Sequence, residues 1–233
     1  MKNHDGKNLT FRLFAAAGLA MTLAGSSAAL AQKATFYTVT YVEVGPVLAR
    51  IGSGALQAYR DAGRKDQGAV LLEVLQRIDR PNQFAVIGVW ADRKAFEAHS
   101  AGEHARKLNE KLATMLAAPN DTRQHNGLSV APAKSGKDAI FAVTHVDVIP
   151  PQKDNGVNAV EQLADQSRKH AGNLIFDVWQ QTNRPNHFTV VEAWSNRGAF
   201  DLHQMQKETR DFRTKLGPMS GALYDERLYK LIK

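Results

Sequence analysis

The stretch RPNQFAVIGVWADRKAFEAH, from Arg80 to His99, returns later in the chain as RPNHFTVVEAWSNRGAFDLH, from Arg184 to His203. Both copies carry Arg-Pro-Asn, Phe, Trp, Ala-Phe and His at one spacing. One offset of 104 residues (Arg80 to Arg184) aligns the two halves without a gap, with roughly one third identity over about 90 positions, the length of a small domain. A register kept over that length indicates an internal duplication, so we expect the halves to fold alike.

Each half predicts the element order β-α-β-β-α-β from its hydrophobic periodicity and its turn residues. In the first half, the predicted strands read ATFYTVTYVEV, AVLLEVLQRI, FAVIGVW and, more weakly, TRQHNGLSV. Helices are expected from Val47 onward, through RKAFEAH, and over Leu108, Leu112, Met115 and Leu116, with Gly68 capping the first helical region. A ferredoxin-like unit of this kind leaves one sheet face bare. We therefore predict an α+β fold in which two tandem ferredoxin-like domains form an intramolecular dimeric-type α+β barrel.

The sequence predicts a leader at the N-terminus, followed by two domains joined by a linker. Basic residues precede an apolar run that closes on Ala29-Leu30-Ala31, which is typical of a signal peptide over residues 1–31, cleaved after Ala31. An uncleaved membrane anchor is the alternative. The predicted domains span residues 35–128 and 139–233, joined by the polar linker 129–138. We expect a periplasmic or secreted protein with no stable membrane insertion after cleavage.

Composition excludes several function classes. The chain has 233 residues, no Cys and a formal charge of +7, so disulfides and thiol chemistry are absent. In an exported protein, scattered basic residues indicate solubility rather than nucleic-acid binding. The sequence has no zinc-protease motif, no Gly-rich phosphate loop after a strand and no G-x-S-x-G elbow. We expect no metal site and no nucleotide cofactor.

Strand alternation sorts the candidate site residues. On the third predicted strand of each half, the aromatic face carries Phe84 and Trp90, or Phe188, Glu192 and Trp194. We expect this face to line a cavity between the two sheets, together with Tyr41 and His145 from the first strands. A tryptophan on a strand is equally often plain core packing. A buried carboxylate needs a partner, so Glu192 is expected to meet His203 or His145.

These residues resemble the antibiotic biosynthesis monooxygenase family, whose pattern is Glu-x-Trp, then Ala-φ-x-x-His, then a second His five residues on. The matching positions of the first half are Trp90, Ala95-Phe96, His99 and His104, with Gly88 in place of the Glu. Those of the second half are Glu192, Trp194, Ala199-Phe200 and His203, with Glu208 in place of the second His. Family members usually pair two identical chains, so this chain resembles such a dimer fused into one.

The resemblance implies a monooxygenase that uses no metal, flavin or haem and acts on a quinol or related small aromatic molecule with O₂. It implies His99 and His203 as bases, and Trp90 and Trp194 as groups that stack on the substrate and offer an indole N–H. The implied substrate-binding residues are Tyr41, His145, Glu192, His104, Phe84 and Phe188. The alternative is a non-catalytic barrel that binds an aromatic molecule or haem. Haem degradation is disfavoured, because the family members that do it use a first-strand Asn that is missing here. The fused barrel could also form a homodimer.

Overall fold

A computed structural model describes residues 36–134, 136 and 138–232, and it contains a closed eight-stranded antiparallel barrel. The first half comprises β1 (Phe36–Glu43), α2 (Ala49–Gly63), β2 (Ala69–Arg77), β3 (Gln83–Trp90), α3 (Arg93–Ser100), α4 (Glu103–Leu112) and β4 (Asp121–Ser129). The second comprises β5 (Ile140–Asp147), α5 (Lys153–Ser167), β6 (Asn173–Gln181), β7 (His187–Trp194), α6 (Arg197–Gln204), α7 (Lys207–Leu216) and β8 (Asp225–Leu231). The element order confirms the prediction for both halves.

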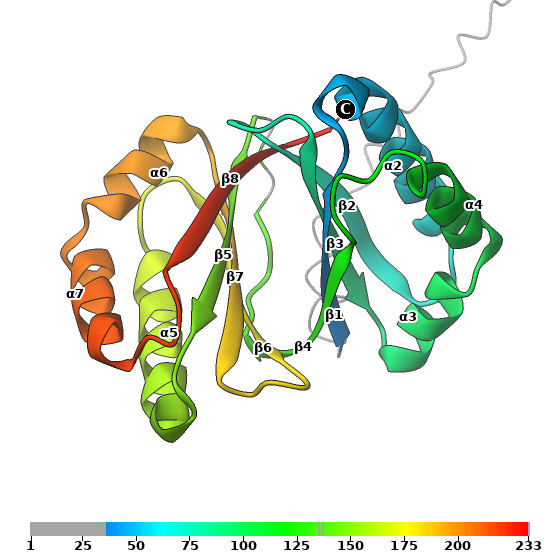
Figure 1. Cartoon of the computed structure of the whole chain (residues 1–233). Coiled ribbons are helices and arrows are strands. Elements are labelled where there is room, and N and C mark those ends of the chain that lie inside the picture. The colour runs from blue at the N-terminus through cyan, green and yellow to red at the C-terminus, as the bar shows by residue number, and fades with distance from the viewer. Residues whose placement is uncertain (1–35, 135, 137, 233) are drawn as a thin grey trace, which may run out of the picture.

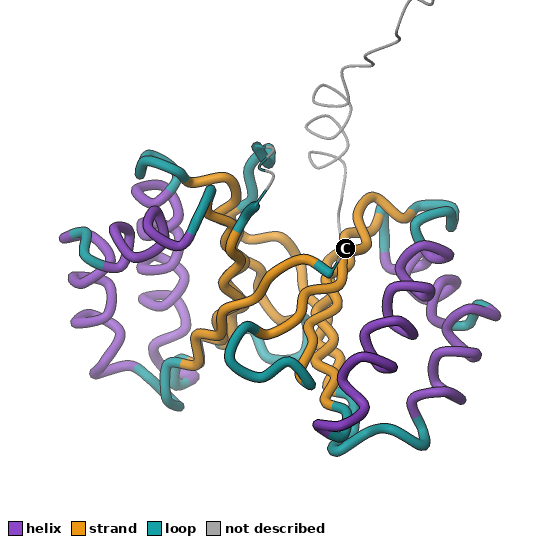
Figure 2. Tube along the Cα trace, turned by 90° about the horizontal axis from the view of Figure 1, so that it is seen from above, coloured by secondary structure: helices purple, strands orange, loops and turns teal. Residues whose placement is uncertain are grey.

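The two halves close the barrel through each other's edge strands. The strand order is β1-β3-β2-β8-β5-β7-β6-β4, so β2 pairs with β8 and β4 pairs with β6. The helices of each half cover the outside of its own sheet, and the two helical layers lie on opposite sides of the molecule (Figures 1 and 2). The expected leader over residues 1–31 lies outside the described residues. Within the described ranges, no helix is long and apolar enough to cross a membrane.

The repeated Arg-Pro-Asn is a turn that fixes the end of the first strand of each half. The Asn82 side chain donates to the Val44 carbonyl oxygen at 2.9 Å, and the Val44 amide donates to the Asn82 carbonyl oxygen at 3.0 Å. The equivalent Asn186 makes the same two contacts with Val148, at 2.6 and 3.0 Å. This motif therefore serves the fold, because it satisfies backbone groups that the strands leave unpaired.

Two details of the helical prediction are wrong. Gly68 has a φ of +83°, as a glycine cap would, but it follows α2 by five residues and opens the turn into β2. Its carbonyl oxygen accepts from the Ala91 amide at 2.8 Å, which joins the start of β2 to the end of β3. The helix α4 ends at Leu112, before Met115 and Leu116, although Met115 is buried in the same core.

The expected face of the third strands is also wrong. Phe84 and Trp90 pack against the helices of their own half, not into the barrel interior. The interior face carries Ala85, Ile87 and Val89. Larger side chains from other strands already fill that interior: Tyr37, Trp179 and Tyr229. Alternation correctly separated the two sets of residues, but it could not say which set met the helices.

Candidate functional site

A cluster of polar and aromatic side chains lies between the first sheet and its helices, centred on His99. The side chain of Asp92 accepts from the Ala95 amide at 2.8 Å and caps the start of α3, which sets the helix over the end of β3. His99, in the last turn of α3, is 2% exposed and lies over Trp90, with ring centroids 4.4 Å apart. The Trp90 indole N–H donates to Thr38 Oγ1 at 3.0 Å, so this N–H is already engaged.

His99 connects a tyrosine to a carboxylate. Its Nε2 lies 2.5 Å from the Tyr59 hydroxyl, and its Nδ1 lies 2.7 Å from Asp66 Oδ2. A carboxylate only accepts, so Nδ1–H donates to Asp66 and Nε2 is left to accept from the Tyr59 hydroxyl. His104 completes the cluster, with its Nε2 3.1 Å from Asp66 Oδ2 and 3.0 Å from His99 Nδ1.

Burial sets the protonation of this cluster. Burial lowers the pKa of His99, the hydrogen bond to Asp66 opposes that effect, and nearby His104 adds to it. Burial, followed by the negative charge of Asp66, raises the pKa of Tyr59. His99 is therefore a neutral imidazole and Tyr59 a neutral phenol at pH 7. Asp66, His99 and His104 can also bring three ligand atoms within 4.8 Å of one another, a geometry that could hold a metal ion.

A cavity of 180 Å³ adjoins the cluster. Tyr59 forms part of its wall, so the chain from Asp66 through His99 reaches the cavity at the tyrosine. Its other lining residues come from β1, β3, the start of β4 with the residue before it, and the three helices: Thr40, Val42, Leu56, Val86, Phe96, Ser100, Ala105, Leu108, Asn109, Asn120 and Thr122. The wall is thus divided about equally between apolar side chains and side chains that carry amide or hydroxyl groups.

The second half places Glu192, Trp194 and His203 in the equivalent position. His203 stacks on Trp194 with ring centroids 4.4 Å apart, and the Trp194 indole N–H donates to Glu192 Oε2 at 2.9 Å. Glu192 Oε2 lies 3.6 Å from His203 Nε2, which confirms the predicted pairing with His203, whereas His145 is on the other face of the sheet. On the far side of the ring, His203 Nδ1 lies 3.0 Å from His170 Nδ1.

Burial dominates the electrostatics of this second cluster. It raises the pKa of Glu192 to about 8, with a contribution from the negative charge of Glu226. It lowers the pKa of His203 to about 3, and the nearby His170 and Arg213 act in the same direction. Both Glu192 and His203 are 2% exposed. At neutral pH we therefore describe them as a carboxylic acid beside a neutral imidazole.

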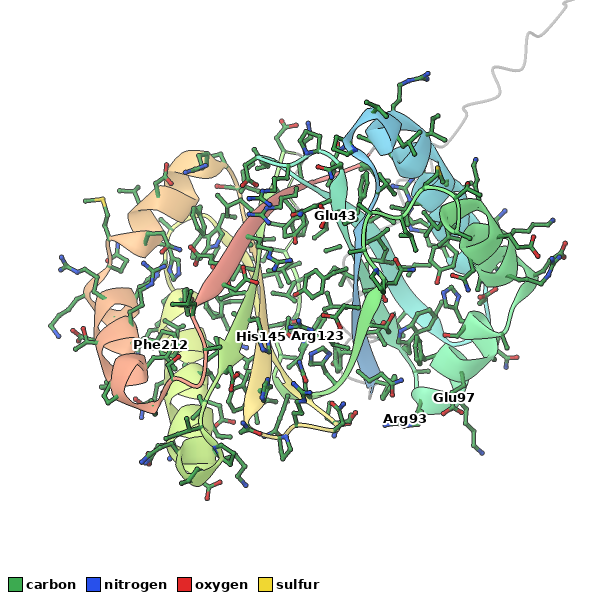
Figure 3. All side chains as sticks on the ribbon, viewed as in Figure 1. Glu43, Arg93, Glu97, Arg123, His145 and Phe212 are labelled. Atoms are coloured by element: carbon green, nitrogen blue, oxygen red, sulfur yellow. The ribbon has the colours of Figure 1, made fainter. Side chains whose placement is uncertain are left out.

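Larger side chains occupy the second half where the first has its cavity. At the offset of 104 residues, Leu108 becomes Phe212 and Asn120 becomes Tyr224. The rings of Phe212 and Tyr224 lie 6.4 Å apart, and Phe212 is buried against the sheet from α7 (Figure 3). Tyr59 is replaced by Leu163, which cannot hydrogen-bond to a histidine. The two halves have therefore diverged at the place where a ligand would bind.

The predicted site residues are divided among three locations. Trp90, His99, His104 and Phe84 lie on the helix side of the first sheet, and Trp194, His203, Glu192 and Phe188 on the helix side of the second. Tyr41 and His145 lie instead in the barrel interior, where Tyr41 is flanked by two guanidinium groups at 5.0 and 5.3 Å. Their functional roles stay predictions.

Sequence reasoning missed Tyr59 as a polar group and missed Asp66 altogether. Tyr59 fits the apolar spacing of the first predicted helix, which gives no sign of a hydrogen bond. The offset of 104 residues held a usable signal: Asp66 pairs with His170, and His104 pairs with Glu208. Each half therefore has one acid and one histidine at these two positions, but their order is reversed between the halves, as expected for two positions in contact.

Known proteins resemble this chain over both of its halves. The model of the family described as "Antibiotic biosynthesis monooxygenase" matches residues 54–111 and 139–215. The chain belongs to this family. "Putative monooxygenase YcnE" of Bacillus subtilis (strain 168) is 22% identical over 76 residues, which cover 33% of this chain and 80% of that protein.

Two solved structures share the fused barrel. A protein of Fusobacterium nucleatum subsp. nucleatum, titled a "Putative monooxygenase", has a TM-score of 0.76 and 14% identity, covering 86% of this chain and 93% of its own. A protein titled "anthrone oxidase-like" has a TM-score of 0.68 and 12% identity, covering 87% and 93%. At these identities the likeness shows the fold alone.

Proposed function

We propose that this protein is an exported, cofactor-independent monooxygenase that oxidises a quinol or related small phenol in the cavity of its first half. The observation that carries the proposal is the hydrogen-bonded chain Tyr59–His99–Asp66, which begins on the cavity wall and ends at a carboxylate. Such a chain can accept a proton from a substrate hydroxyl, the step that makes an aromatic ring electron-rich. The family membership supports this reaction class.

The hydrogen-bonded series Tyr59–His99–Asp66 supplies a proton acceptor without needing an exposed base. As the Tyr59 hydroxyl proton moves to His99 Nε2, the tyrosine oxygen takes the proton of a substrate hydroxyl bound in the cavity. The resulting imidazolium is stabilised by Asp66, which already accepts from Nδ1. The ionised substrate then reduces O₂. One oxygen atom forms a carbonyl at a ring carbon, and the other leaves as water with two hydrogen atoms from the substrate.

The cavity matches a small aromatic substrate in size, and it offers both apolar and polar groups to one. An apolar cavity of about 150 Å³ is enough to bind benzene in another protein, and this one has 180 Å³. Phe96 and Leu108 offer apolar surface for a ring, while Asn109 and Asn120 offer amide groups for a second substrate oxygen. The apolar side chains of the wall would shield the ring of the ionised substrate from water during electron transfer.

The test is oxygen uptake by the mature protein with a panel of phenols, quinols and anthrones, in the presence of a chelator. We expect Tyr59→Phe and His99→Gln to lower kcat by about 10²–10⁴-fold, the usual contribution of a positioned acid or base. His203→Gln is the matched control from the second half and should leave the rate unchanged. Circular dichroism and Tm would show that each variant is folded.

Uptake that persists in both first-half variants, or that is lost only in His203→Gln, would contradict the proposal. Binding of panel compounds without uptake would favour the non-catalytic alternative. Export is a separate part of the proposal and rests on the leader pattern over residues 1–31. Its test is the N-terminal sequence of the protein recovered from the periplasm or medium, which should begin at Gln32.

A further inference from the structure

A second group of metal-ligand side chains lies in the barrel interior, away from the proposed active site. His145 and Asp147 are two residues apart on β5, so both point to the same face of the sheet. His187 opens the neighbouring strand β7 and is the direct cross-strand partner of Asp147. The register of two adjacent strands therefore brings two imidazoles and one carboxylate together.

The three side chains lie close enough to share a single ion once the His187 ring aims one nitrogen at it. At present His145 Nε2 lies 3.2 Å from His187 Nδ1, and the other ring nitrogen, His187 Nε2, lies 3.3 Å from Asp147 Oδ1. One ligand atom from each residue can be chosen so that the three atoms lie within 4.8 Å of one another. Two ligands of a tetrahedral ion at about 2.0–2.1 Å are about 3.3 Å apart, so small side-chain rotations would complete the site.

The surroundings favour a ligand at this place. His145 Nδ1 is buried and has no hydrogen-bond partner among the residues that the structure describes. Two of the nearby basic side chains are already paired: Arg123 with Asp121 at 2.7 Å, and Arg227 with Asp225 at 2.6 Å. Among the described residues, Asp147 forms no ion pair with an arginine or lysine, and its carboxylate faces His187.

The group borders a large polar cavity of 710 Å³. His145, His187 and Arg123 are among its lining residues, and His145 and Arg123 lie side by side between the two sheets (Figure 3). We propose that His145, Asp147 and His187 bind one divalent transition-metal ion, such as Zn²⁺ or Fe²⁺, at the mouth of the barrel interior. Two histidines and one carboxylate are a donor set that both ions use, with positions left open for water or a small ligand.

This inference is independent of the proposed oxygenase chemistry and differs from the sequence-based expectation of no metal. The three ligands are not arranged in one contiguous motif, because β7 enters the site from 40 residues away along the chain (Asp147 to His187). The first half carries Tyr41, Glu43 and Gln83 at the equivalent positions, so the site would belong to the second half alone.

The experiment is a titration of the chelator-stripped full chain with Co²⁺, read by visible absorption, and with Zn²⁺, read by calorimetry. We expect one equivalent to bind to the wild-type protein. His187→Gln places the first half's own residue at this position and should weaken binding by more than about 100-fold, beyond the usual effect of changing a group that only orients a ligand. His145→Tyr does the same at a second position.

The other potential metal cluster supplies the matched control. His104→Glu introduces the residue of the second half next to Asp66 and His99 and should leave the affinity unchanged. Absence of binding to the wild-type protein, loss of binding in His104→Glu alone, or unchanged affinity in a folded His187→Gln would each overturn the proposal. Oxygen uptake in the presence of chelator is measured separately, so its failure leaves this result intact.

Discussion

The buried carboxyl of Glu192 gives a direct test of the electrostatics of the second half. It is 2% exposed, accepts from the Trp194 indole N–H at 2.9 Å, and has its pKa raised to about 8 by burial and by Glu226. In Glu192→Gln, a neutral amide of nearly the same shape replaces a group that is protonated in the folded state at neutral pH. The substitution should therefore become more favourable as the pH rises.

The magnitude follows from linkage. The pKa of Glu192 in the folded chain lies above its ordinary value of 4.5, so the folded state binds the proton more tightly than the unfolded state. Its contribution to stability is fully present below pH 4.5 and is lost as the pH rises to about 8. At about 1.36 kcal/mol per pKa unit, the roughly 3.5 units between these values amount to at most about 5 kcal/mol.

The assay is urea denaturation of the wild-type protein and Glu192→Gln at intervals from about pH 5 to pH 9, compared as a difference in free energy of unfolding. Groups that titrate equally in both proteins cancel in that difference. We expect the variant to gain stability relative to the wild type steadily up to about pH 8 and to level off above it. The pH at which the gain levels off reports the pKa of Glu192 in the folded protein.

One result would refute the reasoning. If Glu192 is instead an anion paired with a protonated His203, whose Nε2 lies 3.6 Å away, then removing the charge would leave a buried cation without its partner. The variant would be less stable than the wild type by about 3–5 kcal/mol near neutral pH. A deficit of that size that does not shrink between pH 5 and pH 8 would show that the pair is ionised.

Three further outcomes test the packing. Asn82→Ala removes the amide that donates to the Val44 carbonyl oxygen and should cost about 1 kcal/mol in urea denaturation, with an unchanged value counting against the turn's role. Gly68→Ala places a side chain at a φ of +83°, where its Cβ would lie 2.6 Å from Ala95 Cβ. We expect a loss of about 1–3 kcal/mol in the free energy of unfolding and a lower Tm. An unaltered Tm would contradict this. Phe212→Ala should cost about 3–5 kcal/mol and open space for a small aromatic ligand, detectable by calorimetry; a smaller cost without ligand binding would show that the site collapses.

The barrel could be predicted from sequence because its signals are local and repeated. Alternation along each strand, the Arg-Pro-Asn turn and the helical spacing each occur twice, and every bare sheet face needs a cover. The cavity face could not be predicted in the same way. Trp90 and Val89 are neighbours on opposite faces of β3. Which of these faces meets the helices depends on what the other strands contribute to the barrel interior.

The candidate site was predictable only where the resemblance named residues. His99 and Trp90 came from the family pattern, and the structure places their rings in contact. Asp66 reaches His99 from the turn after α2, 33 residues earlier, and no periodicity marks such a contact. Tyr59 looked apolar at its helical spacing, because a tyrosine hydroxyl has no sequence signature of its own.

The two halves hold an acid and a histidine beneath the same Trp–His pair, with their places exchanged. In the first half the acid, Asp66, follows α2 and the histidine, His104, begins α4, with 3.1 Å between Oδ2 and Nε2. In the second half His170 follows α5 and Glu208 lies on α7, with 3.9 Å between Nε2 and Oε2. Either change alone would have placed two acids or two histidines together, whereas the exchange keeps one acid beside one histidine in each half.

The exchange decides which half can accept a proton. His99 Nδ1 faces a carboxylate at 2.7 Å, which would stabilise an imidazolium. His203 Nδ1 faces the His170 ring at 3.0 Å, which would repel one, and the carboxyl on its other side belongs to Glu192, protonated at neutral pH. The second half also lacks the tyrosine that leads to a cavity, since Leu163 stands in the place of Tyr59. These differences are the reason that we propose proton transfer in the first half alone.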